Sequence, residues 1–142
     1  MHFKKLIILC VSLLLLTSFA MAQANSAMYK EALHIFKNYR YQVDYTDFQI
    51  KTYEEGGQQI LQLLVIIKSG RNRFDEALLV GFAASGAAII KTEAKIDRVS
   101  VVVKVQYKDE VSIAATADAS DVIKLFKDEM DVSTFMGRLT WY

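Results

Sequence analysis

An uncharged run of 14 residues, from position 77 to 90, constrains the fold of this chain more than any other feature. Inside a helix, each of its two glycines would cost about 1 kcal/mol relative to alanine. Close approach of the helix to another surface, most simply a β-sheet, would offset this cost. The run is also shorter than the roughly 20 apolar residues that span a bilayer. We therefore expect a buried core helix from 74 to about 94. Its small residues are Gly81, Ala83, Ala84, Ser85, Gly86, Ala87 and Ala88.

Two β-hairpins are expected on either side of this helix. Valine or tyrosine occupies every second position from 99 to 107, a period of two that is typical of a strand with one buried face. A returning strand follows over 111–117. Before the helix, the stretches 41–53 and 59–68 are separated by Gly56-Gly57, which supplies the positive φ of a tight reversal.

The remaining segments favour helices. Apolar residues recur at spacings of three and four between 26 and 39, which indicates an amphipathic helix. Another helix is expected after Asp118 or Ser120, ending near Met130, with Val122, Leu125, Phe126 and Met130 on its buried face. A short helical turn and a packed terminus are expected over 131–142. The predicted fold is α+β: a four-stranded antiparallel sheet with helices packed on it, in the order α-β-β-α-β-β-α.

Residues 1–22 have the pattern of a signal peptide. Lys4 and Lys5 form a cationic start, an apolar run follows over 6–20, and Ala20-Met21-Ala22 supplies the small residues of a cleavage site. Cleavage after Ala24 fits almost as well. The apolar run is too short for a typical transmembrane helix, which disfavours an uncleaved anchor. We expect a periplasmic or secreted protein in which 23–142 forms a single α+β domain without a membrane span.

The composition of the mature chain excludes several classes of protein. Removing 1–22 takes away Lys4 and Lys5 and changes the formal net charge from +1 to −1, whereas nucleic-acid binding normally needs a basic excess. The single cysteine, Cys10, lies in the segment that is removed. Neither a disulfide nor a thiol nucleophile is therefore expected, and stability has to come from the packed core.

The sequence contains no recognisable catalytic or cofactor motif. His34 is the only histidine of the mature chain. Glu31 lies three residues before it on the same helix face, but a metal site of ordinary type needs several His, Cys or carboxylate ligands at short spacing. An enzyme would require His34 to meet acids such as Asp44, Asp47 or Glu93 in a cleft. We expect no cofactor, no metal site and no catalytic residue.

Two groups of residues are candidates for binding. Tyrosines cluster around the first hairpin, and tyrosine is enriched in recognition surfaces. A cationic segment precedes the central helix and is a candidate for contact with an anion or a partner. The tyrosines are Tyr39, Tyr41, Tyr45 and Tyr53, and the cations are Lys68, Arg71 and Arg73.

Three functions are compatible with these patterns. The first is a non-catalytic module of the cell envelope that binds a protein partner or assists assembly through its hairpin edge and tyrosines. The second is a carrier that holds a small hydrophobic ligand between helix 74–94 and the sheet. The third, and least favoured, is an enzyme that uses His34 with nearby carboxylates.

Overall fold

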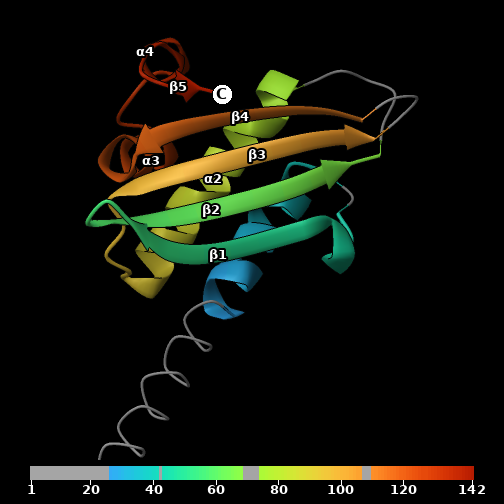
Figure 1. The fold of residues 1–142 in the computed structure, drawn as a ribbon, viewed down its shortest axis with the longest axis horizontal. Helices are drawn as coiled ribbons and strands as arrows, with labels where there is room; N and C mark the ends of the chain where they lie inside the picture. The colour runs from blue at the N-terminus through green and yellow to red at the C-terminus, as the bar shows by residue number, and fades with distance from the viewer. Residues whose placement is uncertain (1–25, 42, 69–73, 107–109) are drawn as a thin grey trace, which may run out of the picture.

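One β-sheet carries the helices of this protein on one of its faces (Figure 1). The computed structural model describes residues 26–41, 43–68, 74–106 and 110–142. The α+β class predicted from the sequence is confirmed. The elements are a helix over 26–38, η1 (Tyr45–Asp47), β1 (Phe48–Glu55), β2 (Gln58–Ile67), α2 (Phe74–Thr92), β3 (Arg98–Gln106), β4 (Glu110–Asp118), α3 (Ala119–Phe126), α4 (Val132–Gly137) and β5 (Thr140–Trp141).

The sheet is mixed, so the prediction of four antiparallel strands is wrong in detail. Its strand order is β1-β2-β3-β4-β5, and β2 pairs with β3 in parallel while the other neighbours are antiparallel. The 19 residues of α2 extend about 28 Å, nearly the length of the ten-residue β2 at roughly 3.3 Å per residue. The helix therefore returns the chain to the end of the sheet where β2 begins, and β3 must run beside β2 in the same direction.

The fifth strand was not expected from the sequence. Thr140 and Trp141 pair with Thr116 and Ala115 at the edge of β4. A strand of two residues is too short to show an alternating pattern, so its pairing depends on where α4 delivers the chain. The short helical turn predicted in this region is α4. Its N-cap is Asp131, and the hydrogen bonds that Thr134 donates hold the pKa of the Asp131 carboxyl below its ordinary value.

The small residues of α2 allow it to lie directly on its neighbours, as the sequence predicted. A Cβ atom built on Gly81 would lie 2.6 Å from Val101 Cγ1 of β3. One built on Gly86 would lie 2.9 Å from the backbone oxygen of Val122 in α3. Neither position has room for a methyl group, so each glycine marks a close contact, one with the sheet and one with α3.

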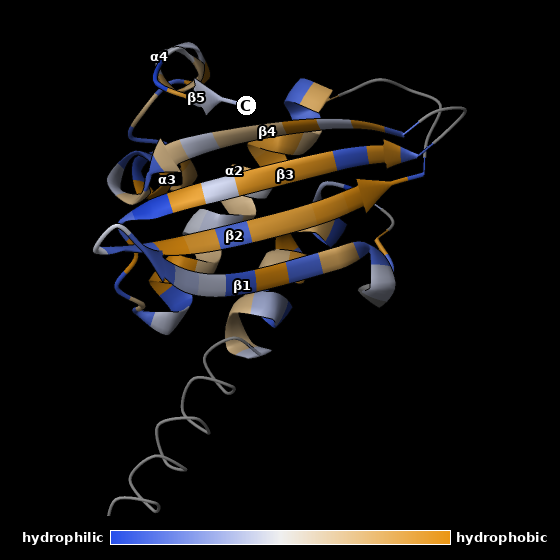
Figure 2. Ribbon diagram, in the orientation of Figure 1, coloured by the Kyte–Doolittle hydropathy of each residue, from blue (hydrophilic) through white to orange (hydrophobic). Residues whose placement is uncertain are grey.

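Aromatic side chains connect the helical layer to the rest of the core. Phe36, in the helix over 26–38, packs edge-on against Phe48 of β1 with ring centroids 5.4 Å apart. Phe82 of α2 makes the same kind of contact with Phe135 of α4 at 5.1 Å. All four rings are buried. Figure 2 shows that hydrophobic residues also dominate β2 and β3, the two central strands of the sheet.

The helix over 26–38, α2 and α3 are each followed by a non-glycine residue with positive φ: Arg40 at 63°, Glu93 at 54° and Asp128 at 60°. Such a conformation costs an L-residue roughly 1–2 kcal/mol. Glycine avoids this strain, but it lowers stability by about 0.4–1 kcal/mol because it increases the conformational entropy of the unfolded chain. Glu93→Gly is therefore expected to raise the free energy of unfolding by about 0.5–1 kcal/mol in urea denaturation. Lys91→Gly, inside the last turn of α2, should lower it by about 1 kcal/mol. Equal losses in both variants would contradict this explanation.

Candidate functional site

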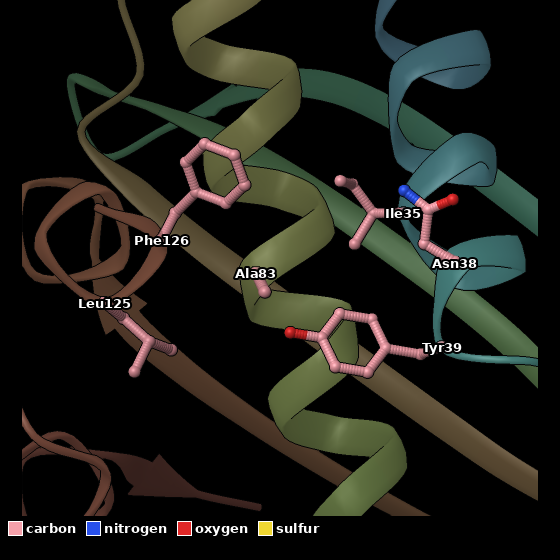
Figure 3. Close-up of a pocket in the computed structure, with 6 residues that line it drawn as sticks. All are labelled: Ile35, Asn38, Tyr39, Ala83, Leu125 and Phe126. Carbon is pink, nitrogen blue, oxygen red and sulfur yellow. The ribbon is translucent and has the colours of Figure 1, made fainter. Parts of the chain in front are cut away.

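A groove of about 390 Å³ lies on the helical layer, on the side of α2 that faces away from the sheet (Figure 3). The helix over 26–38 forms one wall, α3 forms the other, and α2 forms the floor. The hypothesis from the sequence placed a ligand on the opposite side of α2, where Gly81 lies directly against Val101. The residues lining the groove are Ile35, Asn38, Tyr39, Ala83, Leu125 and Phe126.

Helical spacing explains why these side chains face the groove. Asn38 and Tyr39 follow Ile35 by three and four residues, so all three side chains project from the same side at the end of this helix. Leu125 and Phe126 lie at the C-terminal end of α3. Between the two walls, Ala83 projects only a methyl group, which leaves a depression over the backbone of α2.

The two aromatic residues of the groove are exposed. Tyr39 has 58% of its surface accessible and Phe126 has 38%, whereas Phe36, Phe48, Phe82 and Phe135 are buried. In Figure 3 the hydroxyl end of Tyr39 points across Ala83 toward the α3 wall. The groove therefore presents aromatic surface over an uncharged floor, and all six residues that line it lack a formal charge.

The structure separates the tyrosines that the sequence grouped together. Tyr39 lines the groove, and Tyr41 is half-buried with its ring edge-on to Phe36 at 6.0 Å. Tyr53 points to the face of the sheet opposite the helices, where Lys51 Nζ lies 5.7 Å from its ring centroid. Of Tyr45 only the backbone, in η1, is described. The tyrosines whose side chains are described thus do not form one surface.

Of the predicted cationic segment, only Lys68 falls among the described residues. Its Nζ lies 3.1 Å from Asp47 Oδ2, and the Asp47 side chain is only 11% exposed. This ion pair connects the end of β2 to η1, so Lys68 has a structural partner. Arg71 and Arg73 lie outside the described residues, as does the predicted signal peptide.

His34 is exposed, and its Nε2 lies 3.3 Å from Asn38 Nδ2 beside the groove. Among the described residues, no carboxylate lies within ion-pair distance of His34. Asp47, one of the acids considered as its partner, is paired with Lys68. In the same part of the chain, no three His, Cys, Asp or Glu side chains come together as a metal site would require.

Sequence periodicity identified four of the six groove residues, as members of apolar helix faces. It placed Ile35 and Tyr39 on the apolar face of the first helix, and Leu125 and Phe126 on that of the third. Burial on these faces is wrong for both Tyr39 and Phe126, which are exposed, because periodicity shows which residues share a face but not whether a neighbour covers them. Ala83 carries no distinguishing signal in the sequence, because it is one of seven small residues between positions 81 and 88.

Two further observations bear on this site. In the part of the chain that the structure describes, no helix combines the length and the hydropathy needed to cross a bilayer. Comparisons with protein-family models, with curated proteins and with solved structures found no match to this chain.

Proposed function

We propose that this protein is an exported, non-catalytic binding module of the cell envelope, and that the groove over Ala83 holds apolar side chains of a protein partner. The observation that carries the proposal is the exposure of Tyr39 and Phe126 on opposite walls of a groove with a methyl floor. Exposed aromatic surface is costly in water, and aromatic residues are enriched in recognition sites.

The shape of the groove favours a protein partner. Its volume of about 390 Å³ is near the lower end of the roughly 300–1,000 Å³ of small-molecule pockets. Figure 3 shows that its walls come from two separate segments on either side of α2, and the groove is partly open to solvent. An open groove of this kind fits one or two side chains that project from a larger surface.

Polar groups at one wall add direction to the apolar contact. The Asn38 side chain and the hydroxyl of Tyr39, the residue that follows the helix over 26–38, lie on one wall, whereas Leu125 and Phe126 of the α3 wall are hydrocarbon. A partner side chain with an apolar body and a polar tip would match this asymmetry.

The signal-peptide pattern supports action in the envelope, because it directs the chain out of the cytoplasm.

Photo-crosslinking in the native envelope tests the proposal. Benzoylphenylalanine in place of Tyr39 is expected to form a covalent adduct with one envelope protein. Adding Ala83→Arg should reduce the yield by about tenfold or more, because a long charged side chain fills the floor and removes the apolar contact. Gln58→Arg is the matched control: it adds the same charge at an exposed position in the first hairpin, away from the groove, and should leave the yield unchanged.

Two results would contradict the groove as the binding site. One is an adduct whose yield is the same with and without Ala83→Arg, and the other is the absence of any adduct from the Tyr39 position. Circular dichroism and urea unfolding of the Ala83→Arg variant should match those of the parent protein. Ala83 is partly exposed, so the added side chain has a route to solvent.

A further inference from the structure

The face of the sheet opposite the helices carries apolar side chains at its centre. Leu64 of β2, Val102 of β3 and Ala114 of β4 are direct neighbours in the strand register, so they form one row across the sheet. Ile60 and Ile66 lie on the same face of β2. No described helix lies across this face, because all of them pack on the other side (Figure 1).

β2 has the composition of a strand that is covered on both faces, whereas β3 is apolar on its helical face and mixed on the opposite one. On β2, the residues Leu61, Leu63 and Val65 point toward the helices and are fully buried. The alternate positions on the side away from the helices are Ile60, Leu64 and Ile66, with Gln58 and Gln62 as the polar exceptions. On this side Ile60 is buried, while Leu64 and Ile66 remain partly exposed in a single chain.

We infer that a second copy of this chain supplies the cover, with the open faces of two sheets packed against each other. The charges of this face make it compatible with itself. Arg98 Nη1 lies 3.4 Å from Asp118 Oδ1, and Lys104 Nζ lies 3.8 Å from Glu110 Oε1. These two cross-strand ion pairs lie on either side of the apolar row. On β1, Lys51 and Glu55 carry opposite charges on the same face. Formal charges on the face cancel, and two identical faces meet without net repulsion.

The area of the face is sufficient for a dimer. Strands of about nine residues are roughly 30 Å long. Four of them, spaced by roughly 4.8 Å, give a width of roughly 19 Å. Each copy then contributes roughly 570 Å², or roughly 1,100 Å² for the pair, against the roughly 1,000 Å² that a specific interface needs. An interface at this lower limit is expected to dissociate in the micromolar range.

The resulting dimer is a four-layer sandwich. The two sheets would lie about 10 Å apart, with the helical layers outside. The groove lined by Tyr39 and Phe126 is on the outer side of α2, so each copy keeps its groove accessible. Dimerisation therefore does not depend on the proposed function of the groove, and each can be tested without the other.

Sedimentation equilibrium of the exported protein tests the inference. The unmodified protein is expected to be a dimer with a dissociation constant below about 10 µM. Leu64→Lys places a charge in the middle of the apolar row and should weaken dimerisation by about tenfold or more. Val111→Lys is the matched control, since Val111 is 50% exposed on the helical side of β4 and should leave the dissociation constant unchanged.

A cysteine at the interface provides a second measurement that does not depend on how well Leu64→Lys folds. Ser100 lies in the row next to Leu64 and Val102 on the open face, and the exported form has no cysteine once Cys10 is removed. The thiol of Ser100→Cys should react with a maleimide about tenfold more slowly at protein concentrations above the dissociation constant of the dimer than at concentrations well below it. A monomeric protein up to about 100 µM, or a labelling rate independent of concentration, would overturn the inference.

Discussion

Replacing Gly86 by alanine is expected to lower the free energy of unfolding by about 1–3 kcal/mol, although alanine is the better helix former. The new Cβ would lie 2.9 Å from the backbone oxygen of Val122 and 3.0 Å from Phe126 Cβ. A backbone oxygen inside α3 cannot rotate aside, so α2 and α3 have to move apart. Overpacking of this kind outweighs the roughly 1 kcal/mol that alanine contributes through helix propensity. Urea unfolding of the two proteins measures the difference.

Two further glycines provide the controls. Gly137 is the last residue of α4, and a Cβ atom built there meets nothing within 4 Å. Gly137→Ala should therefore be neutral or stabilise by up to about 1 kcal/mol. Gly81→Ala should destabilise, and Val101→Ala in the same chain should recover part of the loss, because the clash there is with a Val101 methyl group. A Gly86→Ala protein as stable as its parent would contradict the close contact of α2 with α3.

Removal of the Phe82 ring is expected to cost more, about 3–5 kcal/mol for Phe82→Ala. Phe82 is completely buried, and its ring meets the ring of Phe135 edge-on at a centroid distance of 5.1 Å. The substitution leaves a cavity between α2 and α4. Because Phe135 is the buried residue of α4, that helix should lose much of its attachment to the core. Urea unfolding gives the total loss, and hydrogen exchange of the α4 amides reports the local effect.

The test of Phe82 also has a matched control and a coupling measurement. Tyr39→Ala removes an aromatic ring that is 58% exposed in the groove and should cost no more than about 1 kcal/mol. If the two rings stabilise each other, the effects of Phe82→Ala and Phe135→Ala should fail to add by at least about 0.5 kcal/mol. A loss below about 1 kcal/mol for Phe82→Ala would show that the cavity collapses or that the ring does not pack as described.

Local patterns correctly predicted most of the individual elements. The helix expected over 74 to about 94 is Phe74–Thr92, and the alternating stretch that begins at Val99 lies in β3. Gly56 and Gly57 have the positive φ values expected of the first hairpin turn. These features depend on side-chain spacing and on backbone conformations that neighbouring residues decide among themselves. They could therefore be inferred without knowledge of the rest of the fold.

The candidate site was predicted less well. Tyr39 was singled out, but the sequence grouped it with Tyr41 and Tyr53, which the fold directs to other environments. Ala83 and Phe126 gained their role only when α2 came to lie between two flanking helices. A groove is defined by the space that neighbouring elements leave unfilled, and one-dimensional periodicity contains no information about that space.

The sequence by itself determined the α+β class, the close seating of the glycine-bearing helix and the apolar character of the central strands. Only the tertiary structure decided the parallel pairing of β2 with β3, the fifth strand and the position of the groove. The reason is the range of the interactions involved. Helix and strand patterns arise from residues close in the chain, whereas strand direction and grooves depend on where long connections such as α2 bring distant segments together.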